Sequence, residues 1–306
     1  MTNVTSNKDY LSAVGLTVIS SCLVGVLSIV GKYLIPYLST PMLIFLRLAA
    51  PALVMWWMAY ISQSEMGFAG SQKLLLQRSL MSMLAQACFF GYLYFSTAFN
   101  ATLLLMTSPL YVPVIARLID KTPIKPHHWA SLILSFIGIA LILKPDTGIF
   151  QWSSILGIAS GIFHAIAQWT YHRMSKKTKA STITMYMYTY GSLIALIPLA
   201  IFYSIRGIPD VHYSHADVFY IIVLVLLMAF AAINTQVLRG FAFKKVNKAH
   251  SLMPFVYVAV VFVGFYEAIV FKVYPDAWSV TGAILVFFGL NILVAAKIFG
   301  SKTVKQ

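Results

Sequence analysis

Long apolar stretches separated by short polar connections make up most of this sequence. A helix needs about 20 residues to cross the hydrocarbon core of a bilayer, and these stretches are close to that length. Backbone N–H and C=O groups inside hydrocarbon must be satisfied within their own segment, so each stretch is predicted to be a helix. Ten such spans can be drawn: Tyr10–Gly31, Pro41–Ile61, Ser79–Phe99, Ala101–Ile119, His128–Leu143, Ser153–Tyr171, Thr182–Tyr203, Val218–Leu238, His250–Phe271 and Trp278–Ile298.

The basic residues separate clearly when the connections are numbered alternately as inside and outside. Of the 22 Lys and Arg residues, 17 then lie inside, 4 lie outside and Arg47 lies within a span. Arg78 and Arg239 belong to the inside group in this assignment. Cytoplasmic loops carry an excess of Lys and Arg, so both termini are predicted to be cytoplasmic. An error of one span would scramble the separation, which therefore also supports the count of ten.

Composition excludes several classes of protein. The chain has 306 residues, of which 60% are hydrophobic and 10% are charged, against about 25% charged residues in soluble domains. The spans consume almost the whole chain and leave no room for a soluble catalytic domain. The net charge of +14 would suggest nucleic acid as the partner of a soluble protein. Here the basic residues lie in short loops, which favours a topological role and contacts with lipid headgroups and no binding of nucleic acid.

The chain also repeats itself weakly. Residues Leu104–Val112 resemble Ser251–Val258, and each copy is followed by a polar link, a Trp and an apolar helix. Two halves of five spans are implied, residues 1–146 and 147–306. Five is odd, so the second half is predicted to be inverted in the membrane relative to the first. Inverted repeats build alternating-access carriers with a site near the midplane.

Three stretches resemble the drug/metabolite transporter superfamily, in its ten-helix EamA-like branch. They are Ser108–Arg117, the helix Ile137–Pro145 and the end of the second copy, Pro275–Leu285. The resemblance implies an all-α membrane fold and a central cavity lined by spans one, three, four, six, eight and nine. Substrates in this superfamily include amino acids, quaternary amines, nucleotide-like metabolites and drugs.

Two charged residues lie inside spans. Glu267, in the ninth span, is a candidate to bind a cationic group of the substrate or to couple transport to protons, because intramembrane carboxylates usually face a cavity or a partner. Arg47, at a similar depth in the second span, could contact a carboxylate or phosphate of the substrate. The structural alternative is that both residues reach the interface or that they form an ion pair with each other.

Polar and aromatic side chains near the middle of other spans are candidates for the same site. His164 and Gln168 are four residues apart and share a helix face, next to Trp169. They could line the cavity or form hydrogen bonds between helices. Three more residues are predicted to contact the substrate: Tyr92, Asn234 and Tyr257. Pro109 and Pro254 fall inside spans four and nine and are predicted to kink them.

No catalytic or metal-binding motif accompanies these residues. The sequence lacks GxSxG, HExxH, a Walker A motif and a dinucleotide fingerprint. Cys22 and Cys88 both lie inside spans and suggest neither a disulfide nor a metal site. We therefore expect no enzymatic activity, no cofactor and no bound metal.

These observations predict a secondary transporter that moves a small polar or amphipathic organic metabolite by alternating access, with protons as a candidate coupling ion. The alternatives are a flippase for a lipid or lipid precursor and, from other classes, an intramembrane enzyme or a receptor. The expected partners are the solute and membrane lipids, and the expected state is a monomer or weak dimer. The predicted location is the bacterial cytoplasmic (inner) membrane, as a multi-pass protein.

Overall fold

A computed structural model describes residues 7–63, 68, 70–119, 126–143, 152–175, 178–207, 213–245 and 253–300. Within these residues all regular secondary structure is helical, which confirms the all-α prediction. The helices are α1 (Asn7–Leu34), α2 (Thr40–Ile61), α3 (Gln72–Phe95), α4 (Ala98–Met106), α5 (Ser108–Ile119), α6 (Pro126–Leu143), α7 (Trp152–Ser175), α8 (Ala180–Arg206), α9 (His215–Lys245), α10 (Met253–Phe271) and α11 (Ala277–Gly300).

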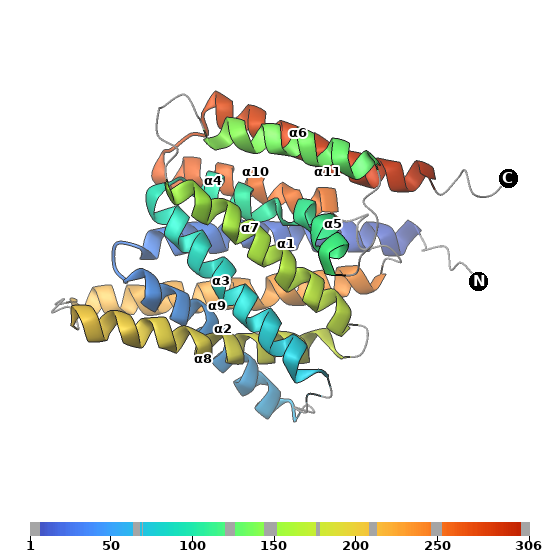
Figure 1. Ribbon diagram of the computed structural model, residues 1–306. Helices are drawn as coiled ribbons and strands as arrows, with labels where there is room; N and C mark the ends of the chain where they lie inside the picture. The colour runs from blue at the N-terminus through green and yellow to red at the C-terminus, as the bar shows by residue number, and fades with distance from the viewer. Residues whose placement is uncertain are drawn as a thin grey trace.

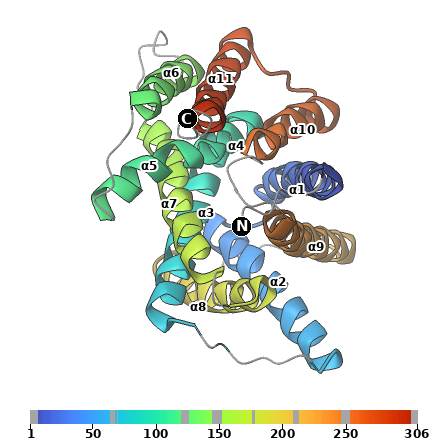
Figure 2. The same cartoon turned by 90° about the vertical axis from the view of Figure 1, so that its right-hand side faces the viewer.

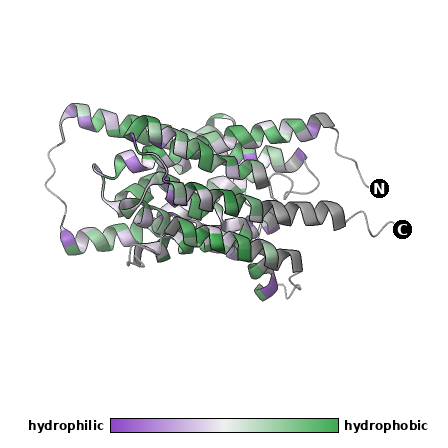
Figure 3. Ribbon diagram, turned by 90° about the horizontal axis from the view of Figure 1, so that it is seen from above, coloured by the Kyte–Doolittle hydropathy of each residue, from purple (hydrophilic) through white to green (hydrophobic). Residues whose placement is uncertain are grey.

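Four of these helices, α1, α2, α8 and α9, are long and apolar enough to cross a membrane by length and composition alone. The helices are mostly hydrophobic along their length, as the hydropathy colours of Figure 3 show, and many large apolar side chains are exposed. Leu53 and Trp57 on α2 are 71% and 65% exposed, and Phe219 and Phe230 on α9 are 69% and 60% exposed. Soluble monomers rarely expose apolar surface on this scale, whereas lipid requires it.

The fourth predicted span is a pair of helices in the structure. Helix α4 ends at Met106 and α5 begins at Ser108, with Thr107 between them. The turn that leads into this pair lies at Ser96 and Thr97, and Asn100, where we expected the turn, is inside α4. The Thr97 hydroxyl accepts a hydrogen bond from the Asn100 N–H at 3.1 Å, as an N-cap residue does.

The two prolines expected to kink spans four and nine lie at helix starts. Pro109 is the second residue of α5 and Pro254 is the second residue of α10. Proline is tolerated in the first turn of a helix, where its missing N–H has no intrahelical partner to lose. The fourth span is interrupted at Thr107, two residues before Pro109, whereas residues 246–252 lie outside the described part of the chain, so the kink at Pro254 stays a prediction.

The helices pack as partners that are distant in sequence (Figures 1 and 2). Helix α1 packs on α9 and α10, α2 on α8, α3 on α7 and α8, and α6 on α11. Helix α4 contacts both α7 and α10, and α5 contacts α7. The start of α1 and the end of α11 lie at the same end of the bundle (Figure 1).

Glycines allow the closest approaches between these helices. A Cβ atom at Gly138 on α6 would lie 2.6 Å from the carbonyl oxygen of Gly282 on α11. A Cβ atom at Gly161 on α7 would lie 2.7 Å from the carbonyl oxygen of Leu104, one turn before the break at Thr107. Small residues permit this backbone contact in membrane helices. Gly161 thus allows the end of α4 to pack tightly against α7, beside the cavity described next.

Candidate functional site

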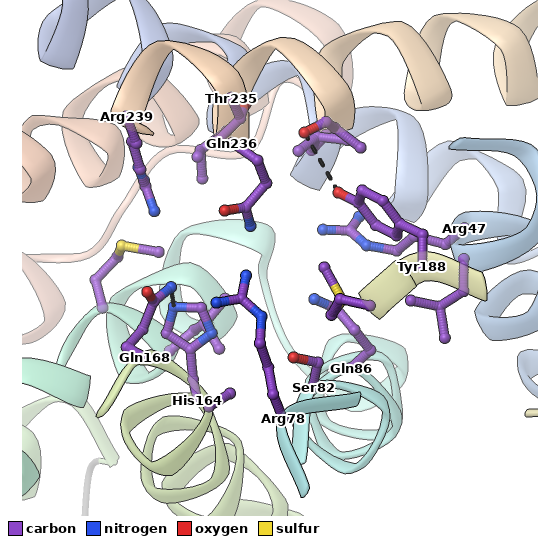
Figure 4. A pocket seen from close by; sticks show the side chains of 18 residues that line it. Arg47, Arg78, Ser82, Gln86, His164, Gln168, Tyr188, Thr235, Gln236 and Arg239 are labelled. Carbon is purple, nitrogen blue, oxygen red and sulfur yellow. Dashed lines mark hydrogen bonds between the residues drawn. The ribbon is translucent and has the colours of Figure 1, made fainter. Parts of the chain in front are cut away.

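A cavity of about 80 Å³ lies in the middle of the bundle and is lined by residues of α1, α2, α3, α4, α7, α8 and α9. Ten of its eighteen lining residues are polar or charged, and Figure 4 shows these ten around the central space. They are Arg47, Arg78, Ser82, Gln86, His164, Gln168, Tyr188, Thr235, Gln236 and Arg239. The apolar lining residues are Val24, Leu27, Leu48, Leu105, Met106, Ala167, Met187 and Ala232.

Three arginines from three helices point into this cavity (Figure 4). Arg78 on α3 and Arg239 on α9 are only 2% and 7% exposed, and Arg47 on α2 is half-buried. Their buried nitrogen atoms lack hydrogen-bond partners among the described residues: Nη1 of Arg47, Nε and Nη1 of Arg78, and Nε and Nη2 of Arg239. Buried polar groups normally have partners, so these donors are available to a ligand or to water in the cavity.

No carboxylate faces these arginines from the cavity wall, because none of the eighteen lining residues is Asp or Glu. Aromatic rings support two of the guanidinium groups. The Arg78 guanidinium carbon lies 3.7 Å from the centroid of the Tyr171 ring, and that of Arg47 lies 5.2 Å from the centroid of the Phe90 ring. Cation–π contacts fix the position of a cation without neutralising its charge. The site is therefore strongly electropositive.

Neutral polar groups complete the wall. The side-chain amide of Gln168 donates a hydrogen bond to Nε2 of His164 at 3.2 Å. The Tyr188 hydroxyl donates to the carbonyl oxygen of Ala232 at 3.3 Å. Gln86 Oε1 is buried without a partner among the described residues, so it is available as an acceptor at the cavity.

His164 and Gln168 thus line the cavity, as does Arg47, but the neighbouring Trp169 does not. The Trp169 ring lies under the guanidinium group of Arg173, at 4.7 Å from centroid to carbon. It packs beside the cluster formed by Tyr111, Ile115 and Ala165. Trp169 follows Gln168 directly, and consecutive residues on a helix point about 100° apart, which turns the ring away from the cavity.

Three other predicted contacts also lie outside the lining. Tyr92 on α3 is 5% exposed and packs near Gly157 on α7. Asn234 on α9 donates to the carbonyl oxygen of Phe230 at 2.8 Å, one turn earlier in its own helix. Tyr257 on α10 is 5% exposed, and its ring lies 6.1 Å from that of Phe287. Tyr92 and Tyr257 are buried and Asn234 bonds to its own helix, so none of the three lines this cavity, and their contact with a substrate stays a prediction.

Glu267 is also outside the cavity lining, and its partner is Lys32 instead of Arg47. Its Oε1 atom accepts from Lys32 Nζ at 2.6 Å and from the Ala98 N–H at 2.8 Å, and Oε2 accepts from the Phe99 N–H at 2.8 Å. Ala98 and Phe99 are the first two residues of α4. The carboxylate therefore caps a buried helix N-terminus, where an anion is favoured by the unpaired N–H groups and the helix dipole.

The structure corrects the assignment of Arg78 and Arg239 to cytoplasmic connections. Arg78 is the seventh residue of α3, and Arg239 lies six residues before the end of α9. The third predicted span begins just after Arg78 and the eighth ends just before Arg239, because a charged residue near a helix end lowers the local hydropathy as a loop residue would. The only available signal was helix continuation: both helices extend about two turns beyond the apolar run.

Part of the chain is similar to known proteins. Residues 11–144 match the sequence profile of the EamA-like transporter family. A protein of Vibrio cholerae serotype O1 named "Riboflavin transporter" is 29% identical over 84 residues, which are 28% of this chain and 28% of that protein. A protein of Rhizobium johnstonii with the same name is 26% identical over 100 residues, 33% of this chain and 32% of that protein. The matched segments thus span about a third of these relatives or less.

A solved structure titled "Crystal structure of protein" is similar over nearly the full length. The alignment covers 94% of this chain and 99% of the other, with a TM-score of 0.63 and 12% sequence identity. At this identity the similarity concerns the fold alone, that is, the arrangement of the helices along the chain and in space.

Proposed function

We propose that this chain, which belongs to the EamA-like transporter family and is a multi-pass integral membrane protein, is a secondary transporter of a small organic metabolite. The observation that carries the proposal is the polar cavity enclosed by α1–α4 and α7–α9 inside an otherwise apolar bundle. Polar and ionisable groups are costly in a membrane and mark a substrate pathway by default. The mechanism is alternating access around this cavity, without a cofactor.

The packing of the helices supports two repeats, residues 1–146 and 147–306, related by two-fold symmetry. If α1, α2, α3, α4–α5 and α6 correspond to α7, α8, α9, α10 and α11, exchange of the halves leaves the pattern of partners unchanged. The contact of α1 with α9 becomes that of α7 with α3, and the contact of α1 with α10 becomes that of α7 with α4 and α5. The pairs α2–α8 and α6–α11 each join a helix to its own counterpart. Five spans per half make these repeats inverted and put both termini on one side, which the excess of Lys and Arg in the inside connections assigns to the cytoplasm.

The similarity to bacterial proteins named "Riboflavin transporter" makes riboflavin the first solute to test, beside amino acids, nucleosides and organic acids. The bacterial cytoplasmic membrane is the corresponding location. The driving force is the gradient of the solute itself or of protons. The family and both relatives are transporters, which places the chain outside the enzymes.

Solute flux into liposomes that contain the purified protein tests the proposal. Ser82 on α3 lines the cavity, and Ser82→Phe fills part of it. Leu76→Phe is the matched control, since Leu76 lies on the same helix and is 51% exposed on its outer face. We expect flux with the wild-type protein and with Leu76→Phe, and loss of flux with folded Ser82→Phe. Folded wild-type protein that moves none of the solutes would refute the proposal, as would equal flux in all three proteins.

A further inference from the structure

The three cavity arginines define a charge pattern that a transporter for neutral solutes does not need. Arg47 and Arg78 come from the first half of the chain and Arg239 from the second, and all three reach the same space (Figure 4). Within the described residues, the ion pair that the structure contains is Lys32–Glu267, which lies outside this lining. The cavity therefore concentrates three positive charges without a protein anion in its wall.

We propose that the cavity binds a small aliphatic organic anion with at least two negative charges, carried by carboxylate or phosphate groups. This inference rests on the proposed transport function and names its substrate class. Planar guanidinium groups match the geometry of carboxylate and phosphate oxygens and bind them through paired hydrogen bonds. A neutral solute would leave all three charges uncompensated, and a monoanion would leave two, which is costly because Arg78 and Arg239 are buried.

The distribution of the lining residues orients this anion. Helices α1 and α4 contribute only apolar lining residues: Val24, Leu27, Leu105 and Met106. Helices α3, α7 and α9 contribute most of the hydrogen-bonding groups. A ligand with a carbon skeleton toward α1 and α4 and oxyanion groups toward α3 and α9 satisfies both sides, which favours an organic anion over an inorganic one.

Aromatic residues are scarce in the cavity wall. Tyr188 and His164 carry the two aromatic rings among the eighteen residues that line the space. A flat ring system such as a flavin is normally bound in a larger space, and a cavity of about 80 Å³ leaves little room for three fused rings. The ligand skeleton is therefore aliphatic, as in a di- or tricarboxylate or in a phosphate ester of a small polyol.

The same geometry predicts an unusual response to neutralising substitutions. An arginine held in a structural ion pair stabilises the fold, and its replacement leaves an unpaired partner. Arg78 and Arg239 have no such carboxylate partner in the cavity wall, so Arg78→Gln and Arg239→Gln remove uncompensated buried charge. We expect the ligand-free variants to unfold at the same temperature as the wild type or higher, while their affinity for the anion falls. A purely structural role would produce the opposite pattern.

The test compares matched probes on the purified full chain in detergent, with thermal unfolding and equilibrium binding as readouts. The pairs are succinate with succinamide, glycerol 3-phosphate with glycerol, and flavin mononucleotide with riboflavin. Arg206→Gln is the control, because Arg206 lies exposed at the end of α8. We expect the aliphatic dianions to bind at least about tenfold more tightly than their neutral partners, and Arg78→Gln or Arg239→Gln to weaken this binding about tenfold to hundredfold. Arg206→Gln should leave the affinity unchanged.

The outcomes separate this inference from the proposed transport function. If riboflavin or another neutral solute moves through the protein in a manner sensitive to Ser82→Phe but not to the arginine substitutions, the transporter stands and the anion assignment is wrong. If dianions bind in an arginine-dependent manner but no solute crosses the membrane, the anion site stands and the transport proposal fails.

Two further arms address the source of the anion and the behaviour of the variants. Arginine-dependent movement of labelled phosphatidylglycerol between leaflets, without flux of soluble dianions, would assign the phosphate to a lipid headgroup and overturn the solute assignment. If a Gln variant does not fold, Arg78→Lys keeps the charge but loses the paired geometry, and we expect an intermediate loss of affinity. Equal binding of charged and neutral probes to the wild-type protein would refute the inference without any variant.

Discussion

Replacement of Glu267 by Gln tests whether this carboxylate is a structural cap. The wild-type side chain accepts three hydrogen bonds, from Lys32 Nζ and from the Ala98 and Phe99 N–H groups. A glutamine has one oxygen, and its NH₂ group can only donate. Whichever way the amide is turned, a donor therefore faces either the Phe99 N–H or the pair formed by Lys32 and the Ala98 N–H. The change removes the charge and at least one acceptor from a side chain that is 1% exposed.

The magnitude follows from these contacts. A hydrogen bond to a charged group contributes about 1.5–3 kcal/mol, and an N-cap contributes about 0.5–2 kcal/mol. Breaking a buried ion pair typically costs about 3–5 kcal/mol. The Lys32 side chain is 22% exposed, so water can solvate its ammonium group after the carboxylate is lost, and we expect a cost near the lower end of this range. We expect Glu267→Gln to lower the free energy of unfolding by about 3 kcal/mol.

Thermal unfolding in detergent and the yield of folded protein measure this change. Lys32→Met is the matched partner variant, and the double variant should be less destabilised than the sum of the two single ones, because the residues contact each other. Arg47→Gln should instead be additive with Glu267→Gln within about 0.5 kcal/mol, since the two side chains do not pair. A Glu267→Gln protein of wild-type stability that loses solute binding or its response to a pH gradient would show that the carboxylate acts in transport and that our structural interpretation is wrong.

Three further predictions follow from positions away from this cap. Gly138→Ala should destabilise the fold by about 1–3 kcal/mol, because its Cβ atom would lie 2.6 Å from a backbone oxygen of α11. The control Gly15→Ala should be neutral or stabilising, because its Cβ atom would meet no atom within 4 Å. Thermal unfolding of the two variants measures the difference. In a background without the native cysteines, a membrane-impermeant reagent added outside should label a cysteine at Asp276 and not one at Lys245; the reverse would refute cytoplasmic termini. His164→Ala should weaken solute binding about tenfold with unchanged folded yield, and equal loss of both would assign the residue to packing.

Apolar length was sufficient to predict the helices, because a stretch of about 20 apolar residues has few alternatives in a membrane. It was not sufficient to predict their ends. Helix α9 begins at His215 and ends at Lys245, well beyond the apolar stretch Val218–Leu238. Polar residues at the membrane interface can continue a helix although they lower the local hydropathy. The hydropathy pattern therefore ends the predicted helix too early. The break at Thr107 lies two residues before Pro109, and the close approach of Gly161 on α7 to Leu104 beside it is a tertiary feature that no local pattern contains.

The candidate site was predicted only in part, for a related reason. His164 and Gln168 were identified by their shared helix face, and Arg47 by its depth in a span. Arg78 and Arg239 were missed because a charged residue near the end of a helix cannot be distinguished from a loop residue by hydropathy. The sequence composition also does not indicate in which direction a side chain points. The depth of a charged residue in a predicted span identifies it as unusual. Whether it then binds a helix end or faces a cavity depends on the packing of the neighbouring helices.

The two kinds of intramembrane charge in this protein differ in how completely they are satisfied, and this difference locates function. Glu267 has a cation and two N–H groups around its carboxylate, so its negative charge is already compensated within the protein. The guanidinium groups of Arg78 and Arg239 have buried donors without described partners, in a space that also contains an unpaired acceptor at Gln86. A fold gains no stability from uncompensated buried charge. Such groups persist because a second molecule supplies the compensation, and the cost of the empty site then becomes part of the selectivity for an anion.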